Sequence, residues 1–99
     1  MLLIKRRFFE DIRRGRKTTT LRYWRSMRVQ AGSVHTVPGL GRIRIDRILP
    51  IHPENISEQD AREDGFASAA ELHKALADLY PRYKRHDRRL YKIHFTLLE

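Results

Sequence analysis

Apolar residues alternate with polar ones in several short segments, and this alternation predicts β-strands. In residues 42–48, Ile43 and Ile45 alternate with arginines, so one face of that strand is expected to be buried and the other wet. Residues 90–98 alternate in the same way. The threonine-rich residues 18–24 suit a strand because β-branched side chains pack well on a pleated surface. Five strands are predicted, over residues 1–5, 18–24, 33–37, 42–48 and 90–98.

Other segments carry the signals of short helices. Residues 6–15 place apolar residues at helical spacing and end at a glycine, which readily takes the left-handed conformation that closes a helix. Ser57 has Asp60 three residues later, which matches the capping box that opens a helix. Ser68 and Glu71 have the same spacing. Helices are predicted over residues 6–15, 57–65 and 68–80, the last with an apolar stripe of Leu72, Ala75, Leu76 and Leu79.

The order of these elements favours a small α+β domain. The strands are short, and their connections are too short for the crossovers of a doubly wound parallel sheet. We therefore expect one domain over residues 1–99. It is predicted to be a small mixed or antiparallel β-barrel of five or six short strands, with two or three short helices packed on it.

The charge of the chain is strongly positive and unevenly distributed. The net charge is +9, and residues 1–47 carry 13 Lys and Arg against 3 Asp and Glu, whereas residues 48–99 carry 8 and 9. A basic half on a small domain is typical of a protein that contacts a polyanion, which makes RNA or a nucleotide-like ligand the expected partner. The alternative is a charged surface that serves only solubility.

Composition also excludes several classes of protein. The chain has no cysteine, which rules out disulfides, thiol nucleophiles and thiolate metal sites and fits a cytoplasmic location. No stretch approaches the ~20 apolar residues of a membrane span, and the first residues do not resemble a signal peptide. The five histidines lack the spacing of a metal site, and no phosphate-binding or dinucleotide-binding glycine pattern is present. We therefore expect no membrane contact, no metal and no cofactor.

The segment GRKTTTLR concentrates hydroxyl groups and cations. In an extended strand Leu21 would face the core, and alternation then places Thr18, Thr20 and Arg22 on the opposite face. Together with Lys17, these side chains are expected to form a small electropositive site. Lys17 would hold an anion or carbonyl or activate a hydroxyl, Thr20 would act as a nucleophile or donor, and Arg22 would orient an oxygen-rich ligand. The alternative is a solvated polar strand face.

Asp64 stands in the last turn of a predicted helix, directly before Gly65. The helix dipole disfavours a negative charge at this end, which indicates a cationic partner, and Lys17 is the candidate. The alternative is an ordinary surface acid.

Trp24 and Arg25 lie just past the threonine run, among further arginines. An aromatic ring interleaved with arginines suits base stacking and phosphate contact, so both residues are candidate ligand contacts. The alternative places the tryptophan in the core.

Four segments stand in order along the chain: the pattern G-x-K-T-x-T-x-R, the pattern D-A-x-x-x-G-F within SEQDAREDGF, the helix SAAELHKALADLYP and the closing strand LYKIHF. Together they resemble the ASCH domain, a branch of the PUA-like β-barrel superfamily. The resemblance covers most of the chain. It implies a PUA-like barrel with a cleft beside GRKTTTLR, and a role in binding RNA or nucleoside-like ligands.

For some small bacterial members, the resemblance implies an amidohydrolase that removes acyl groups from the exocyclic nitrogen of cytidine. In those members the lysine and a threonine of the first motif act with a glutamate that precedes the glycine of the second. The matching residues here are Lys17, Thr20 and Asp64. Aspartate is shorter than glutamate by roughly 1.5 Å, and misplacement on that scale can cost ~10²-fold in rate.

Two hypotheses of function follow. The first is a binding module that holds RNA or a modified nucleoside through Lys17, Arg22 and the basic first half of the chain. The second is an enzyme that hydrolyses an N-acyl nucleoside amide at Lys17, Thr20 and Asp64. The positive charge favours the binder and the intact K-T-x-T pattern favours the enzyme. Because Asp64 departs from the family glutamate, binding ranks first.

Overall fold

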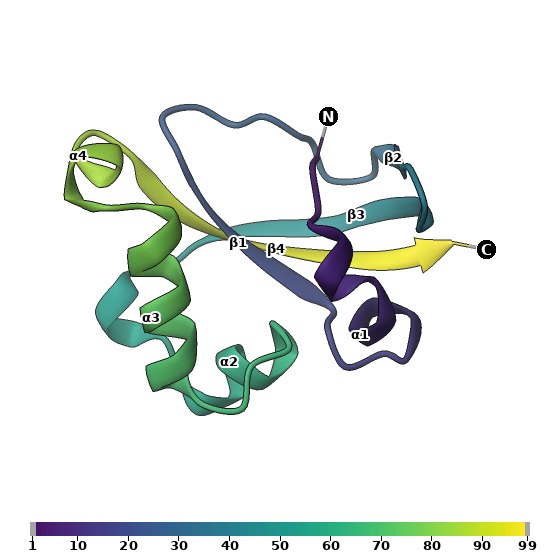
Figure 1. Cartoon of the computed structure of the whole chain (residues 1–99). Helices are drawn as coiled ribbons and strands as arrows, with labels where there is room; N and C mark the ends of the chain where they lie inside the picture. The colour runs from purple at the N-terminus through teal and green to yellow at the C-terminus, as the bar shows by residue number, and fades with distance from the viewer. Residues whose placement is uncertain (1, 99) are drawn as a thin grey trace.

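The computed structural model describes residues 2–98, which form one curled sheet with short helices around it (Figure 1). The strands are β1 (Thr19–Trp24), β2 (Val34–Val37), β3 (Gly41–Pro50) and β4 (Arg89–Leu98). The α-helices are α1 (Phe9–Arg13), α2 (Glu58–Glu63), α3 (Ala69–Leu79) and α4 (Arg82–Arg85), and two 3-10 turns are η1 (Arg6–Phe8) and η2 (Pro53–Asn55). Among the described residues, no helix is long and apolar enough to span a membrane.

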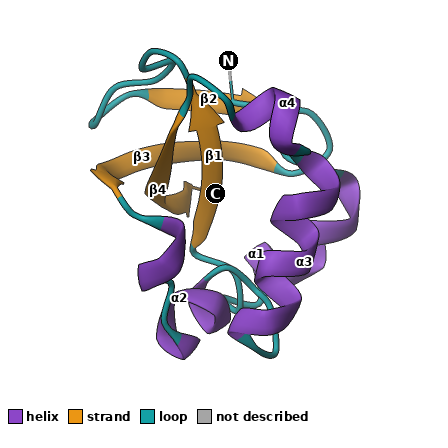
Figure 2. Ribbon diagram, turned by 90° about the vertical axis from the view of Figure 1, so that its left-hand side faces the viewer, coloured by secondary structure: helices purple, strands orange, loops and turns teal. Residues whose placement is uncertain are grey.

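The four strands form one antiparallel sheet in the order β1-β4-β3-β2, so the last strand in sequence lies between the first and the third. The sheet curls, and β1 crosses β3 steeply in Figure 2. This antiparallel α+β architecture confirms the predicted fold class. Four of the five predicted strands are present, with ends shifted by one or two residues.

The predicted strand over residues 1–5 is wrong. Residues 2–5 are extended but join no strand ladder, and Met1 lies outside the described residues. The reason is that Leu2 inserts its side chain into the core, where it is 1% exposed, and the chain turns into η1 directly afterwards. Without that strand, residues 2–98 contain four strands rather than the five or six expected, and they form a half-barrel rather than a closed one.

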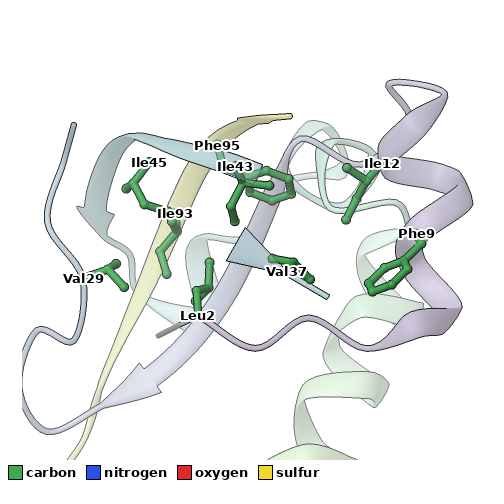
Figure 3. Packing of buried hydrophobic residues seen from close by; sticks show 9 residues of the cluster. All are labelled: Leu2, Phe9, Ile12, Val29, Val37, Ile43, Ile45, Ile93 and Phe95. Carbon is green, nitrogen blue, oxygen red and sulfur yellow. The ribbon is translucent and has the colours of Figure 1, made fainter. Parts of the chain in front are cut away.

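Two separate apolar clusters stabilise the sheet, one on each face. The first joins the sheet to the N-terminal segment and α1 (Figure 3). The second joins it to α2 and α3, and Leu21 is 5% exposed there, as the strand alternation predicts. The first cluster contains Leu2, Phe9, Ile12, Val29, Val37, Ile43, Ile45, Ile93 and Phe95, and the second contains Leu21, Tyr23, Ile56, Ala61, Leu72, Leu76 and Leu90.

The helix signals in the sequence are largely confirmed. Ser57 accepts a hydrogen bond from the Asp60 amide at 3.0 Å and its own amide donates to Asp60 at 2.9 Å, which completes the capping box. Ser68 caps α3 through the Glu71 amide, but Glu71 accepts from the Ala67 amide instead of that of Ser68. In the predicted stripe of α3, Leu72 and Leu76 are buried and Leu79 is 40% exposed.

Candidate functional site

A cavity of about 380 Å³ lies along the outer edge of β1. Because β1 is an edge strand, this side of it has no strand neighbour in the sheet. The N-terminal segment and η1 form one wall, and α3 with the residues around it forms the other. Sixteen residues line it: Leu3, Ile4, Lys5, Arg7, Phe8, Lys17, Thr20, Leu21, Arg22, Asp64, Phe66, Leu72, Ala75, Leu76, Leu79 and Tyr80.

Lys17 and Asp64 meet at the buried end of this cavity, although 46 residues separate them in sequence. The Lys17 Nζ lies 3.2 Å from Asp64 Oδ2 and donates to the Asp64 backbone carbonyl at 2.8 Å. The two backbones also form an isolated β-bridge. A Cβ at Gly65, whose φ is +89°, would lie 3.3 Å from the Lys17 Cβ, so glycine permits this close approach. The predicted pairing of Lys17 with Asp64 is therefore present.

Thr19, which alternates onto the same face of β1 as the core residue Leu21, is the third member of this cluster. Its hydroxyl donates to Asp64 Oδ1 at 3.1 Å, and the residue is completely buried. The sequence contained a signal for this contact, because strand alternation places the side chain of Thr19 on the same side as that of Lys17. Both carboxylate oxygens of Asp64 are thereby engaged, one by a hydroxyl and one by an ammonium group.

Burial perturbs the ionisation of both charged partners. Burial lowers the pKa of the Lys17 ammonium, and the charge of Asp64 opposes that shift. Burial raises the pKa of the Asp64 carboxyl, and Lys17 and Thr19 oppose that shift. The Lys17 Nζ also lies 4.6 Å from the centre of the Phe8 ring, a favourable cation–π contact. A buried lysine with a lowered pKa beside a carboxylate is an arrangement suited to proton transfer.

Thr20 and Arg22 line the same cavity, as the alternation of β1 predicts. Arg22 Nε donates to Thr20 Oγ1 at 3.0 Å, and Arg22 Nη2 donates to the Leu3 carbonyl. Because Thr20 accepts from Arg22, the hydroxyl proton of Thr20 is left to donate to a ligand. The contact to Leu3 ties the N-terminal segment to β1 and helps to form the cavity wall.

Three other candidate residues lie outside this cavity. Thr18 is exposed and borders a shallow hollow on the far side of the Lys17–Asp64 bridge. Trp24 is half-buried and packs on the first apolar cluster with its ring centre 6.1 Å from that of Tyr91. Arg25 is exposed and forms an ion pair with Asp87 at 3.1 Å. The structure thus brings together Lys17, Thr20, Arg22 and Asp64, and separates Thr18, Trp24 and Arg25 from them.

A second buried lysine fixes α2 against the sheet. Lys92 on β4 contacts Asp60 at 2.5 Å and Glu63 at 2.6 Å, both on α2. The amide of Thr18 adds a hydrogen bond to the Glu63 carbonyl at 2.8 Å. These contacts hold the end of α2 beside β1, and so determine where the next residue, Asp64, presents its carboxylate. Within residues 2–98, no group of three or more His, Asp or Glu side chains is arranged to hold a metal ion.

Comparisons with known proteins give no match among family models, and none among curated protein sequences. Three solved structures are similar. The ASCH domain from Lactobacillus crispatus has a TM-score of 0.75 at 21% identity, over 89% of this chain and 68% of that one. The hypothetical protein PH0355 has a TM-score of 0.79 at 14% identity, over 97% of this chain and 95% of that one.

The third similar structure is protein EF3133 from Enterococcus faecalis. Its TM-score is 0.70 at 20% identity, over 93% of this chain and 70% of that one. At these identities the similarity is one of fold. The chain therefore has the fold of an ASCH domain, as its sequence motifs predict.

Proposed function

We propose that the chain binds a nucleoside-like ligand in the cavity beside β1. The observation that carries this proposal is the composition of the cavity wall. Apolar and aromatic side chains form most of it, and six polar side chains, those of Lys5, Arg7, Lys17, Thr20, Arg22 and Asp64, complete it. Small-molecule sites in proteins combine apolar walls with a few convergent polar groups, and their volumes begin at about 300 Å³. The cavity volume of about 380 Å³ suits one small ligand.

The wall chemistry favours a flat ligand with a polar edge. Phe8, Phe66 and Tyr80 line the cavity, and aromatic rings can pack against a base. The open edge of β1 carries backbone amides and carbonyls with no strand partner on that side. Together with the Thr20 hydroxyl, these groups can hydrogen-bond to the donors and acceptors along a nucleobase edge.

A calorimetric titration with cytidine, N4-acetylcytidine and uridine tests this proposal. We expect at least one to bind, and we expect Thr20→Val to weaken that binding at least about tenfold, because it removes a hydroxyl but little volume. Thr36→Val is the matched control, because Thr36 is exposed on β2, away from the cavity. The proposal is wrong if no nucleoside binds, or if both variants weaken binding equally.

Hydrolysis of an N-acyl nucleoside amide is a second candidate. It is supported by the meeting of Lys17, Thr20 and Asp64 at one cavity, and by the 3.2 Å contact that Asp64 makes with Lys17 despite its shorter side chain. In this reaction water adds to the acyl carbonyl carbon and the C–N bond breaks. The acyl group leaves as a carboxylic acid, and the departing nitrogen takes up a proton to become the free amine.

Incubation with N4-acetylcytidine, followed by chromatography of the products, tests this candidate. We expect cytidine and acetate in equal amounts, little product from Asp64→Asn, and preserved or higher activity from Asp64→Glu, which restores the reach of the family glutamate. If N4-acetylcytidine binds but remains intact after prolonged incubation, the chain is a binder and not this enzyme.

A further inference from the structure

Arg22 lines the cavity without an acidic partner of its own within residues 2–98. Its guanidinium is half-buried at the cavity, and it forms no ion pair among residues 2–98. Two of its N–H groups donate to neutral oxygens, one on Thr20 and one on the Leu3 backbone. A guanidinium carries five N–H donors, so the bonds within the protein leave three of them for another acceptor. Burial lowers the pKa of Arg22, and the nearby Tyr80 and Asp64 only partly oppose that shift.

The cavity as a whole has the same imbalance. Lys5, Arg7, Lys17 and Arg22 line it, against Asp64 alone. Asp64 already pairs with Lys17, so the remaining cations have no acid in the cavity wall.

The outer hollow next to the cavity shows that this excess is local. Its wall contains three cations and three acids, Lys5, Arg7, Lys74, Asp11, Glu71 and Asp78. Although the whole chain is basic, the charges balance in this hollow. Lys5 and Arg7 border both spaces and are balanced by the acids of the hollow, so Arg22 is the cation that remains without an acid of its own in the inner cavity.

A neutral ligand would make this imbalance worse. On filling the cavity it would remove water from the guanidinium and supply no opposite charge, which is unfavourable for a cation in low-polarity surroundings. An oxyanion would instead accept two parallel N–H bonds from the arginine fork. We propose that the ligand of this cavity carries an oxyanion group, a phosphate or a carboxylate, that pairs with Arg22. This inference rests on the proposed function, because it specifies the class of ligand for the same cavity.

Matched pairs of neutral and anionic ligands test this proposal by calorimetry. Cytidine is compared with cytidine 5′-monophosphate and cytidine 3′-monophosphate, and uridine is compared with 5-carboxyuridine. The cytidine pairs differ by a phosphate and the uridine pair differs by a carboxylate, so the two oxyanions are tested separately. For at least one pair we expect the anionic member to bind at least about tenfold more tightly, because charge-assisted hydrogen bonds are stronger than neutral ones.

Variants of Arg22 test whether this residue causes the preference for the anionic ligand. Arg22→Gln should bring the ratio of the two affinities close to one, whereas Arg22→Lys should retain part of it, because it keeps the charge and loses the fork. Arg85→Gln is the control, because it removes the same charge from an exposed position on α4. If Arg22→Gln does not fold, Arg22→Lys is compared with the unchanged chain instead. The proposal is contradicted if the ratio of the anionic to the neutral affinity is the same in both.

The outcomes separate this proposal from the proposed function. If nucleosides bind and their anionic partners bind no more tightly, the oxyanion proposal is overturned while the proposed function stands. If no nucleoside or nucleotide binds, the proposed function fails, and benzoate against benzyl alcohol then tests the charge preference alone. A preference for benzoate that Arg22→Gln abolishes supports the oxyanion site, and equal affinities overturn it.

Discussion

Lys17 and Asp64 have side chains only 3% and 5% exposed, so each ion depends on the other for compensation. Taking two charges out of water is costly, and their attraction repays that cost only where further hydrogen bonds satisfy both groups. Here the Asp64 carbonyl and the Thr19 hydroxyl supply those bonds. The pair therefore has a structural role in addition to any role in chemistry.

Lys17→Met is expected to destabilise the protein by about 3–5 kcal/mol, because it leaves the Asp64 carboxylate buried without a counter-ion. The free energy of unfolding in urea measures the loss. The double variant Lys17→Met with Asp64→Leu should recover most of it, because no buried charge then remains. A loss of less than about 1 kcal/mol in the single variant would show that Asp64 is adequately solvated without Lys17.

At the level of elements, α3 is both a core helix and a wall of the cavity. Leu76 is 7% exposed in the second apolar cluster, so Leu76→Ala should reduce the free energy of unfolding by about 2–5 kcal/mol. Leu79→Ala is the matched control on the same helix, and it should cost much less because Leu79 is 40% exposed. Equal losses for the two variants in urea denaturation would contradict the helix orientation described above.

The attachment of α2 to β4 predicts how stability depends on pH. The hydrogen bond from Lys92 lowers the pKa of Glu63, and burial only partly opposes this. Burial alone would raise the pKa of Asp60, but hydrogen bonds from Lys92 and Ser57 outweigh burial, so the pKa of Asp60 is lowered. A carboxyl whose pKa is lower in the folded state stabilises the fold above its unfolded pKa, and this contribution is lost as pH falls through the folded pKa.

Unfolding free energies measured between about pH 5 and pH 2 should therefore decrease more steeply for the unchanged chain than for Lys92→Met. The raised pKa of Asp64 acts with the opposite sign, but it is present in both proteins and cancels in the comparison. Parallel pH profiles would mean that Lys92 does not influence the ionisation of Asp60 and Glu63.

Helices and strands with a local sequence signal could be predicted, whereas the segment whose conformation depends on tertiary contacts could not. Local signals, such as the capping box at Ser57 and the alternation through Ile43 and Ile45, were sufficient for α2 and β3. Residues 1–5 were assigned wrongly because a short apolar run is equally compatible with a strand and with an extended segment that inserts Leu2 into the core. Local sequence does not show which of these the tertiary contacts select.

The site could be predicted in part for the same reason. Lys17 and Asp64 could be paired because an acid at the end of a helix needs a cation. The walls of the cavity could not be predicted, because they depend on the N-terminal segment and α3 meeting across β1. The contact of Arg22 with the Leu3 carbonyl, which helps to form one wall, has no signature in the sequence.

Over the whole molecule, fewer arginines are available to an RNA than the positive charge of the first half of the sequence suggests. Arg22 belongs to the cavity, so it does not contribute to an open basic surface as expected for RNA binding. Arg25 and Arg44 are exposed, and each forms a surface ion pair, with Asp87 and Asp46 respectively. The arginines of β3 remain exposed. RNA binding through the basic first half of the chain stays a prediction, and Arg28, Arg42, Arg44 and Arg47 are its exposed candidate contacts.

Binding of a single-stranded RNA at several salt concentrations measures this surface. Three phosphate contacts predict a slope of about −2 in a log–log plot of affinity against salt. Replacing Arg42, Arg44 and Arg47 by Gln should flatten it. Replacing Arg82, Lys84 and Arg85 of α4 by Gln also removes three positive charges, but this variant should change the slope little. A flat plot for the unchanged chain would exclude phosphate contact as the mode of binding.

The central position of β4 in the sheet has a consequence for biosynthesis. A ribosome makes β1, β2 and β3 before β4, yet within residues 2–98 β1 pairs with β4 and with no other strand. Until residues 89–98 emerge from the exit tunnel, β1 has no ladder and the edge of β3 that will accept β4 is open. The nascent chain therefore presents the unpaired β1 and the open edge of β3 at the same time, and such edges attract other chains. Folding of this domain is completed only after translation has passed its last strand.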